Sequence, residues 1–187
     1  MFTRNEIRDL LISTIVLTLI FSSFRLDIFV STLFIVIIVF ASHEILGHKV
    51  VAQHYGCDAE YKMWPTGLIL GLLTSLIPGG FVVAAPGAVY ITPYKRGFAF
   101  KIAHLTRREY AIISLAGPLI NIMLAFSFLS LNYFYPLEIF GIAYKASFLL
   151  AFFNLLPIPP MDGSKIMFWN LKIWLLVIAV SFVGLFI

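Results

Sequence analysis

The sequence contains a single cysteine and few charged residues. Cys57 is the only cysteine in 187 residues, so the chain can form no internal disulfide and no cysteine-based zinc finger. Charged residues make up 12% of the chain, about half the fraction of a typical soluble domain, while 61% of the residues are hydrophobic. This composition predicts a membrane protein rather than an ordinary soluble domain.

The excess of positive charge does not indicate a nucleic-acid-binding protein. The formal net charge is +4, but the basic residues flank apolar runs, as they do where Lys and Arg set the orientation of membrane helices. We therefore expect a lipid bilayer as a partner and no nucleic acid. The oligomeric state stays open at this point.

Five apolar runs predict membrane-crossing helices, each of which needs ~20 residues. The sequence therefore predicts an all-α polytopic membrane protein with five to six transmembrane helices, formed by residues 1–187 as one domain. We expect it to be an integral multi-pass protein of a prokaryotic cell membrane. The runs lie at about Leu10–Phe24, Ile28–Tyr55, Ala111–Leu131, Ile139–Leu156, and in a last helix that starts near Asp162 and is apolar over Ile173–Ile187.

Residues 59–91 are less regular. Pro78 and Gly79 interrupt an apolar stretch, and Phe81–Ile91 is rich in β-branched, aromatic and small residues. We predict a short membrane-embedded β-hairpin around a re-entrant loop, which requires cover from protein or a cavity. The alternative is a full span over Thr66–Val83. The re-entrant form is favoured because it keeps the basic loop at 92–110 and the N-terminus on one, cytoplasmic, face.

A possible metal site begins at the end of the second apolar run. His43, Glu44 and His48 form the pattern H-E-I-L-G-H. Two histidines and a carboxylate are the ligand set of a catalytic zinc with an open fourth position. Glu44, beside the first histidine, would be the general base. The alternative is a pair of buried histidines that only bind neighbouring helices.

The two histidines are five residues apart, which is one more than in the common H-E-x-x-H pattern. On a regular helix this spacing turns the rings by ~140°, so they could not share one ion. A π-helical turn around Ile45–Gly47 would bring them to the same side, and such turns occur mostly at functional sites. The spacing therefore predicts a π-bulge.

Asp162 is the candidate for the third ligand. It follows the proline-rich approach Pro157, Pro159 and Pro160, which is stiff enough to fix its position. The alternative is that Asp162 serves as the N-cap of the last helix.

Two asparagines are candidates for substrate binding. Asn121 lies just after Gly117 and Pro118 and could donate a hydrogen bond to an oxyanion, and Asn154 precedes the proline-rich segment. The alternative for both is a helix–helix contact in the membrane. At 1.5 Å per residue, His43, Asn154 and Gly117 all lie at a similar depth, ~8–9 Å from one edge of the apolar core.

These motifs resemble the site-2 protease family of intramembrane zinc metalloproteases. The resemblance covers about residues 41–170, and its most specific motif is Asn154–Gly163. It implies that His43, His48 and Asp162 bind one zinc ion and that Glu44 is the general base. It also implies that Gly87, Ala88 and Val89 belong to a membrane-embedded strand that pairs with unwound substrate. The chain departs from the family in its longer first motif, which is similar to the zinc motif of dipeptidyl peptidase III.

We therefore expect an intramembrane zinc endopeptidase that cuts a transmembrane protein substrate near the cytoplasmic face. One alternative is a catalytically inactive zinc-binding relative that acts as a binding or structural protein. Another is a metal transporter that uses the same residues as a transit site.

Overall fold

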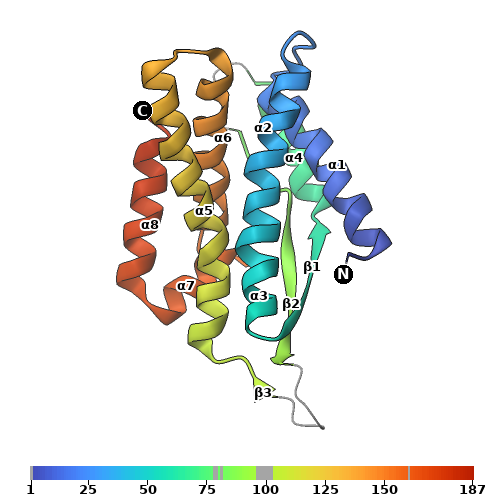
Figure 1. Ribbon diagram of the computed structural model, residues 1–187, viewed down its shortest axis with the longest axis vertical. Helices are drawn as coiled ribbons and strands as arrows, with labels where there is room; N and C mark the ends of the chain where they lie inside the picture. Colours follow the sequence, from blue (N-terminus) through green and yellow to red (C-terminus); the bar gives the residue numbers. More distant parts are fainter. Residues whose placement is uncertain (1, 78–79, 81, 96–102, 160) are drawn as a thin grey trace.

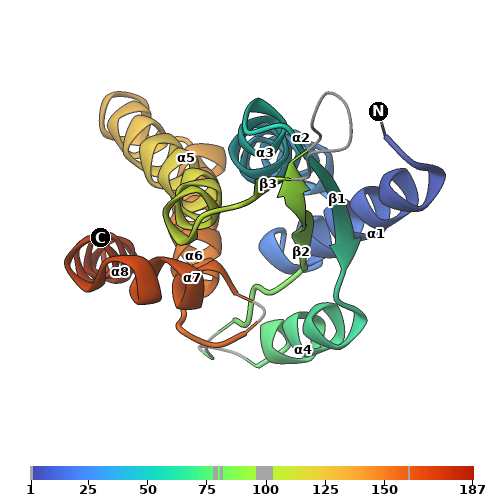
Figure 2. The same ribbon diagram turned by 90° about the horizontal axis from the view of Figure 1, so that it is seen from below.

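The structure, a computed structural model, describes residues 2–77, 80, 82–95, 103–159 and 161–187. Long helices lie side by side, and a small sheet packs beside one end of them (Figure 1). Seen along the helices, α5 to α8 form one group, while α1, α4 and the sheet form another, and α2 and α3 lie near the middle (Figure 2). The helices are α1 (Arg4–Phe21), α2 (Phe29–Ala41), the π-helix η1 (Ser42–Lys49), α3 (Val50–His54), α4 (Pro65–Ser75), α5 (Arg107–Phe134), α6 (Glu138–Asn154), α7 (Asp162–Trp169) and α8 (Leu171–Gly184); the strands are β1 (Cys57–Met63), β2 (Gly87–Lys95) and β3 (Ala103–His104).

Two helices of the described part of the chain are long and apolar enough to cross a membrane. One is the continuous helix Phe29–His54, which joins α2, η1 and α3 over 26 residues, and the other is α5 with 28 residues. The predicted all-α fold with five to six transmembrane helices is therefore wrong, and so is the multi-pass arrangement built on it. The chain also forms a three-stranded sheet, with the order β1-β2-β3.

Local breaks explain why the other apolar runs do not become long spanning helices. Helix α4 has 11 residues, or ~16 Å of length, about half of what a bilayer requires. The last predicted helix, which starts near Asp162, is divided at Asn170, whose side chain caps α8 by accepting the backbone N–H groups of Lys172 and Ile173. Hydropathy counts apolar residues but does not register such caps.

The region between residues 57 and 95 turns back on itself. Strand β1 pairs antiparallel with β2, with Tyr61 opposite Val89 and Lys62 opposite Ala88. The alternative of one span over Thr66–Val83 is wrong, because α4 ends at Ser75. The predicted basic loop at 92–110 instead contains the end of β2, all of β3 and the start of α5.

Some predicted features lie outside the described residues. These are the Pro78–Gly79 interruption, Phe81 at the start of the predicted second strand, residues 96–102 of the predicted basic loop, and Pro160 in the stiff approach to Asp162.

Helix α1 closes the outer edge of β1 with two buried carboxylates. Glu6 accepts the backbone N–H of Tyr61 at 3.1 Å, and Asp9 accepts that of Met63 at 3.2 Å. Lys49, at the end of η1, donates to both carboxylate oxygens of Glu6 at 2.5 and 2.6 Å. The side chains of Lys49 and Glu6 are 5% and 1% exposed. This ion pair therefore joins three elements: α1, β1 and the π-helix.

We predict that Lys49→Met destabilises the protein by about 3–5 kcal/mol, because it leaves the carboxylate of Glu6 buried without its charged partner. The control is Lys62→Met, which removes a lysine that is 55% exposed and 3.9 Å from Glu60, and should cost less than about 1 kcal/mol. The midpoint of unfolding, followed by circular dichroism, measures both. Adding Glu6→Gln to Lys49→Met should recover part of the lost stability, because it removes the unpaired charge. Equal destabilisation by Lys49→Met and Lys62→Met would contradict the prediction.

Candidate metal centre

The predicted π-helical turn is present. Residues Ser42–Lys49 form a π-helix between α2 and α3, without a break in the long helix. A π-turn closes its hydrogen bonds between residues five apart, so residues at that spacing lie on one side. His43 and His48 have this spacing, and their ring centroids are 4.8 Å apart. The π-bulge that the five-residue spacing predicts is therefore confirmed.

Two glycines let the π-helix approach α5 closely. A Cβ on Gly47 would lie 2.5 Å from the Cα of Gly117, which only a glycine avoids. A Cβ on Gly117 would lie 2.7 Å from Cε1 of His48 and 2.9 Å from Nε2 of His43. Gly117 thus leaves room for both imidazole rings. The next residue, Pro118, lies inside α5 and cannot donate a backbone hydrogen bond there.

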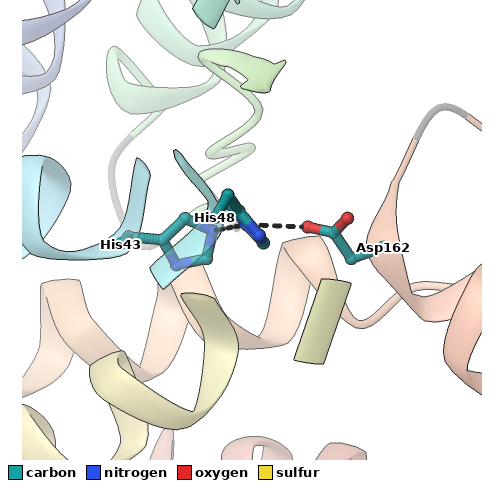
Figure 3. Close-up of side chains that lie close together, drawn as sticks. All are labelled: His43, His48 and Asp162. Atoms are coloured by element: carbon teal, nitrogen blue, oxygen red, sulfur yellow. Dashed lines mark hydrogen bonds and ion pairs between the residues drawn. The ribbon is translucent and has the colours of Figure 1, made fainter. Parts of the chain in front are cut away.

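Three buried side chains bring one ligand atom each to the same point. Nε2 of His48 lies 3.1 Å from Nε2 of His43 and 3.1 Å from Oδ2 of Asp162. Figure 3 shows the two rings together on the π-helix, with the Asp162 carboxylate reaching His48 from the other side. All three ligand atoms lie within 4.8 Å of one another.

The two separations that involve His48 fit a zinc ion. With Zn–N distances near 2.0–2.1 Å, two ligand atoms of a tetrahedral site are about 3.3 Å apart, close to both of the 3.1 Å separations. Two facing imidazole nitrogens also share at most one proton, so at least one lone pair is free to bind a metal. Three protein ligands leave the fourth position of a catalytic zinc open.

His48 is held in the orientation that metal binding requires. Its Nδ1 donates a hydrogen bond to the carbonyl oxygen of Ile113 on α5, at 2.9 Å. A carbonyl oxygen only accepts, so the proton of a neutral ring is on Nδ1 and Nε2 is left as the ligand atom. His43 differs, because no partner of its Nδ1 is found among the described residues.

Asp162 is the first residue of α7, and Met161 is its N-cap. The side chain of Asp162 does not cap the helix, so the predicted alternative role as an N-cap is wrong. Instead, Oδ2 faces His48, and Oδ1 accepts a hydrogen bond from Nζ of Lys165 at 3.0 Å. Gly163 allows α7 to start here, since a Cβ on it would collide with the carbonyl of Leu155.

The charges around Asp162 favour its ionised form. Burial raises the pKa of Asp162, but His48 (in its protonated form, without a metal) and Lys165 lower it by more, so this pKa lies well below its usual range. Burial lowers the pKa of Lys165, but Asp162, followed by Tyr110 and Glu44, raises it by more. Asp162 is therefore a carboxylate and Lys165 a cation at neutral pH.

Glu44 lies on the π-helix next to His43 and is 2% exposed. No partner of its Oε2 is found among the described residues. A buried carboxylate next to a metal site is the group that general-base chemistry requires.

The structure separates the remaining predicted site residues. Asn121 is fully buried on α5, one turn after Gly117, and neither polar atom of its amide has a partner within the described chain. Asn154 is buried too, but its amide donates to the carbonyl of Leu150 in its own helix, at 3.0 Å. Gly87, Ala88 and Val89 form the start of β2.

Sequence reasoning missed Lys165 as part of the site. Its charge fits the general pattern of basic residues that flank apolar runs, although Lys165 stands three residues after Asp162. That spacing places two side chains on the same face of a helix, so the sequence does contain a signal for a contact between Asp162 and Lys165.

We predict that Gly117→Ala abolishes or strongly weakens zinc binding, because its methyl group would occupy the space of both imidazole rings. The matched control is Gly141→Ala, in α6, where an added Cβ meets nothing within 4 Å. There the substitution should be neutral or should stabilise the helix by up to about 1 kcal/mol. Zinc content after purification, measured by atomic emission, separates the two. Full zinc occupancy in Gly117→Ala would show that this glycine does not shape the site.

Comparisons with known proteins agree with this site. The chain is 41% identical over 185 residues to "Putative zinc metalloprotease MJ0611" from Methanocaldococcus jannaschii, covering 94% of this chain and 90% of that protein. It is 33% identical over 147 residues to "Putative zinc metalloprotease YwhC" from Bacillus subtilis, covering 70% of this chain and 64% of that protein. No family model matches the chain, and no solved structure matches it.

The relatives and the geometry identify the same cofactor. Both relatives are named as zinc metalloproteases, and His43, His48 and Asp162 form a ligand set for one metal ion. Zinc is the metal of this site. The first relative is aligned over nearly its whole length, and the chain belongs to the same family of zinc metalloproteases.

Proposed function

We propose that the protein is a zinc endopeptidase that hydrolyses peptide bonds of transmembrane protein substrates, close to the cytoplasmic face of a membrane. The observation that carries this proposal is the position of the site. His43, Glu44 and His48 belong to a helix that is long and apolar enough to cross a membrane, and Gly117 of the second such helix packs directly against them.

The catalytic roles follow from the residues around the metal. Zinc, when bound, supplies Lewis acidity that polarises the scissile carbonyl. His43, His48 and Asp162 hold it, while the hydrogen bond from Nδ1 of His48 to Ile113 keeps that ring from rotating. Glu44 accepts a proton from the attacking water and passes it to the leaving amide nitrogen.

Exposed apolar side chains support a location in a membrane. Only 39% of the most apolar stretch of each of the two long helices is buried in the protein. Large apolar side chains on their outer faces are 46–68% exposed, a surface that water solvates poorly and lipid solvates well. They include Val30, Phe34, Ile38, Met123 and Phe126.

One edge of the sheet is available for an extended substrate. α1 closes the outer edge of β1, whereas among the described residues β3 pairs with β2 only at Tyr94 and Lys95. The earlier part of β2, at Ala88–Ile91, lines a cavity of about 230 Å³ together with Tyr110 and Lys165. Lys165 also binds Asp162, so one residue that lines this cavity contacts a predicted metal ligand.

The pairing register identifies the backbone groups that face this cavity. The N–H of Tyr61 points to Glu6, away from β2, so Tyr61 and Val89 form a non-hydrogen-bonded pair. In β2, Gly87, Val89 and Ile91 therefore direct their N–H and C=O groups to the open edge, while Ala88 and Tyr90 bind β1. An added substrate strand would bind these open groups.

Asn121 is a candidate for contact with the substrate. A buried amide without partners costs free energy, and such groups often have a functional reason. We propose that it donates to the oxyanion that forms on the scissile carbonyl. Asn154 is the weaker candidate, because its amide N–H is already used within α6.

The test of this function is Glu44→Gln, assayed on a single-span membrane substrate in lipid vesicles. The amide has nearly the same shape but cannot accept the proton, so cleavage should fall by about 10²–10⁴-fold while zinc content stays unchanged. Asp162→Ala is the matched contrast and should lose zinc as well as cleavage. Wild-type protein that holds zinc but cuts no membrane substrate would refute the proposal.

We predict that Ile91→Pro raises KM without changing zinc content. A proline there removes an N–H from the open edge and leaves the bonds to β1 intact. Its control is the neighbouring Tyr90→Pro, which removes a bond of the β1–β2 ladder and should lower the unfolding midpoint. If Ile91→Pro leaves KM as in the wild type, the substrate does not use this edge.

A further inference from the structure

Lys165 contacts the metal ligand from the side opposite the histidines. Its Nζ donates to Oδ1 of Asp162 at 3.0 Å, while Oδ2 of the same carboxylate is 3.1 Å from Nε2 of His48. The two oxygens thus have different partners. The Lys165 side chain is 19% exposed and Asp162 is 11% exposed, so water competes little for this contact.

The contact limits how Asp162 can bind a metal. A free carboxylate can bind through one oxygen or through both. Beside two histidines and a bound water, a second carboxylate oxygen would raise the coordination number from four to five and compete with substrate for the metal. With Oδ1 occupied by an ammonium group, Oδ2 is the oxygen left for the metal.

Lys165 also lines two cavities. Together with Tyr110 it lines the cavity along β2, and the same two residues line a second cavity of about 340 Å³ with Arg107, Phe168 and Trp169. The ammonium group is 5.5 Å from the centroid of the Tyr110 ring. This ring on α5 restricts the lysine from the side away from Asp162.

We propose that Lys165 is a positioning residue that restricts Asp162 to binding zinc through Oδ2 alone and so keeps the fourth position open. This inference concerns the same metal centre as the proposed protease function. It rests on that function only for the expected effect of Lys165 on hydrolysis. The effect on the metal is independent of any substrate. No atom of Lys165 takes part in the reaction itself.

The test compares Lys165→Met, which keeps the aliphatic stem but loses the ammonium group, with Lys172→Met, an equal change at an exposed position of α8. Both are made in the full chain, purified in detergent. Zinc affinity is measured by competition with a chromogenic chelator. We expect the dissociation constant of zinc to rise by about 10–100-fold in Lys165→Met, as for other groups that orient metal ligands, and to stay unchanged in Lys172→Met.

A second readout reports coordination itself. Cobalt(II) replaces zinc, and its visible absorption weakens as the number of ligands rises above four. We expect weaker absorption in Lys165→Met, because Asp162 can then use both oxygens, and a near wild-type spectrum in Lys165→Arg, which can still donate to Oδ1. If Lys165→Met does not fold, Lys165→Gln, whose amide is too short to reach Oδ1, should show the same loss.

The outcomes distinguish the two proposals. Wild-type zinc affinity together with a wild-type cobalt spectrum in Lys165→Met would overturn the role of Lys165, even if the protein is an active protease. A lower unfolding midpoint of the metal-free protein with an unchanged cobalt spectrum would also overturn it, since that is what a purely structural role produces. Failure of the wild type to cut any membrane substrate would refute the protease function and leave the metal measurements valid.

Discussion

The site depends on a single departure from α-helical geometry. Five residues separate His43 from His48, and only the π-helix at Ser42–Lys49 brings both rings to one side. A π-helix is wider and less well packed than an α-helix, so neighbouring elements must accommodate it. The close glycine pair Gly47 and Gly117 provides this accommodation, because it lets α5 approach and places the Ile113 carbonyl where it can hold His48.

The sequence predicted this part of the molecule because a metal imposes a geometric condition. Two histidines that share one ion must lie on the same side, and a spacing of five then requires a π-turn. Asp162 could be predicted for a similar reason, since a carboxylate in an apolar chain requires a charged partner. The contact of Asp162 with Lys165 was not predicted, because it depends on how α7 begins, and that depends on the packing of Gly163 against Leu155.

The number of helices that are long and apolar enough to cross a membrane could not be predicted correctly from hydropathy. An apolar run looks the same whether or not it is interrupted, and the interruption at Asn170 is a cap formed by one polar side chain. The first run also follows a polar segment, in which Glu6 and Asp9 bind β1. These contacts join residues about 55 positions apart and leave no periodic signal in the sequence. They also decide which edge of the sheet is closed and which stays open.

The charges of the site favour a dication at its centre. Lys165 balances Asp162, which leaves the buried carboxylate of Glu44 with no partner for Oε2 among the described residues. Burying an uncompensated carboxylate is costly, and a positive charge held by the neighbouring imidazoles would offset that cost. Glu6 shows the alternative solution a short distance away, because its carboxylate is neutralised by Lys49 and accepts a backbone N–H. The same long helix thus carries Lys49, which neutralises Glu6 and stabilises the fold, and Glu44, whose carboxylate differs from that of Glu6 in that its Oε2 has no partner among the described residues.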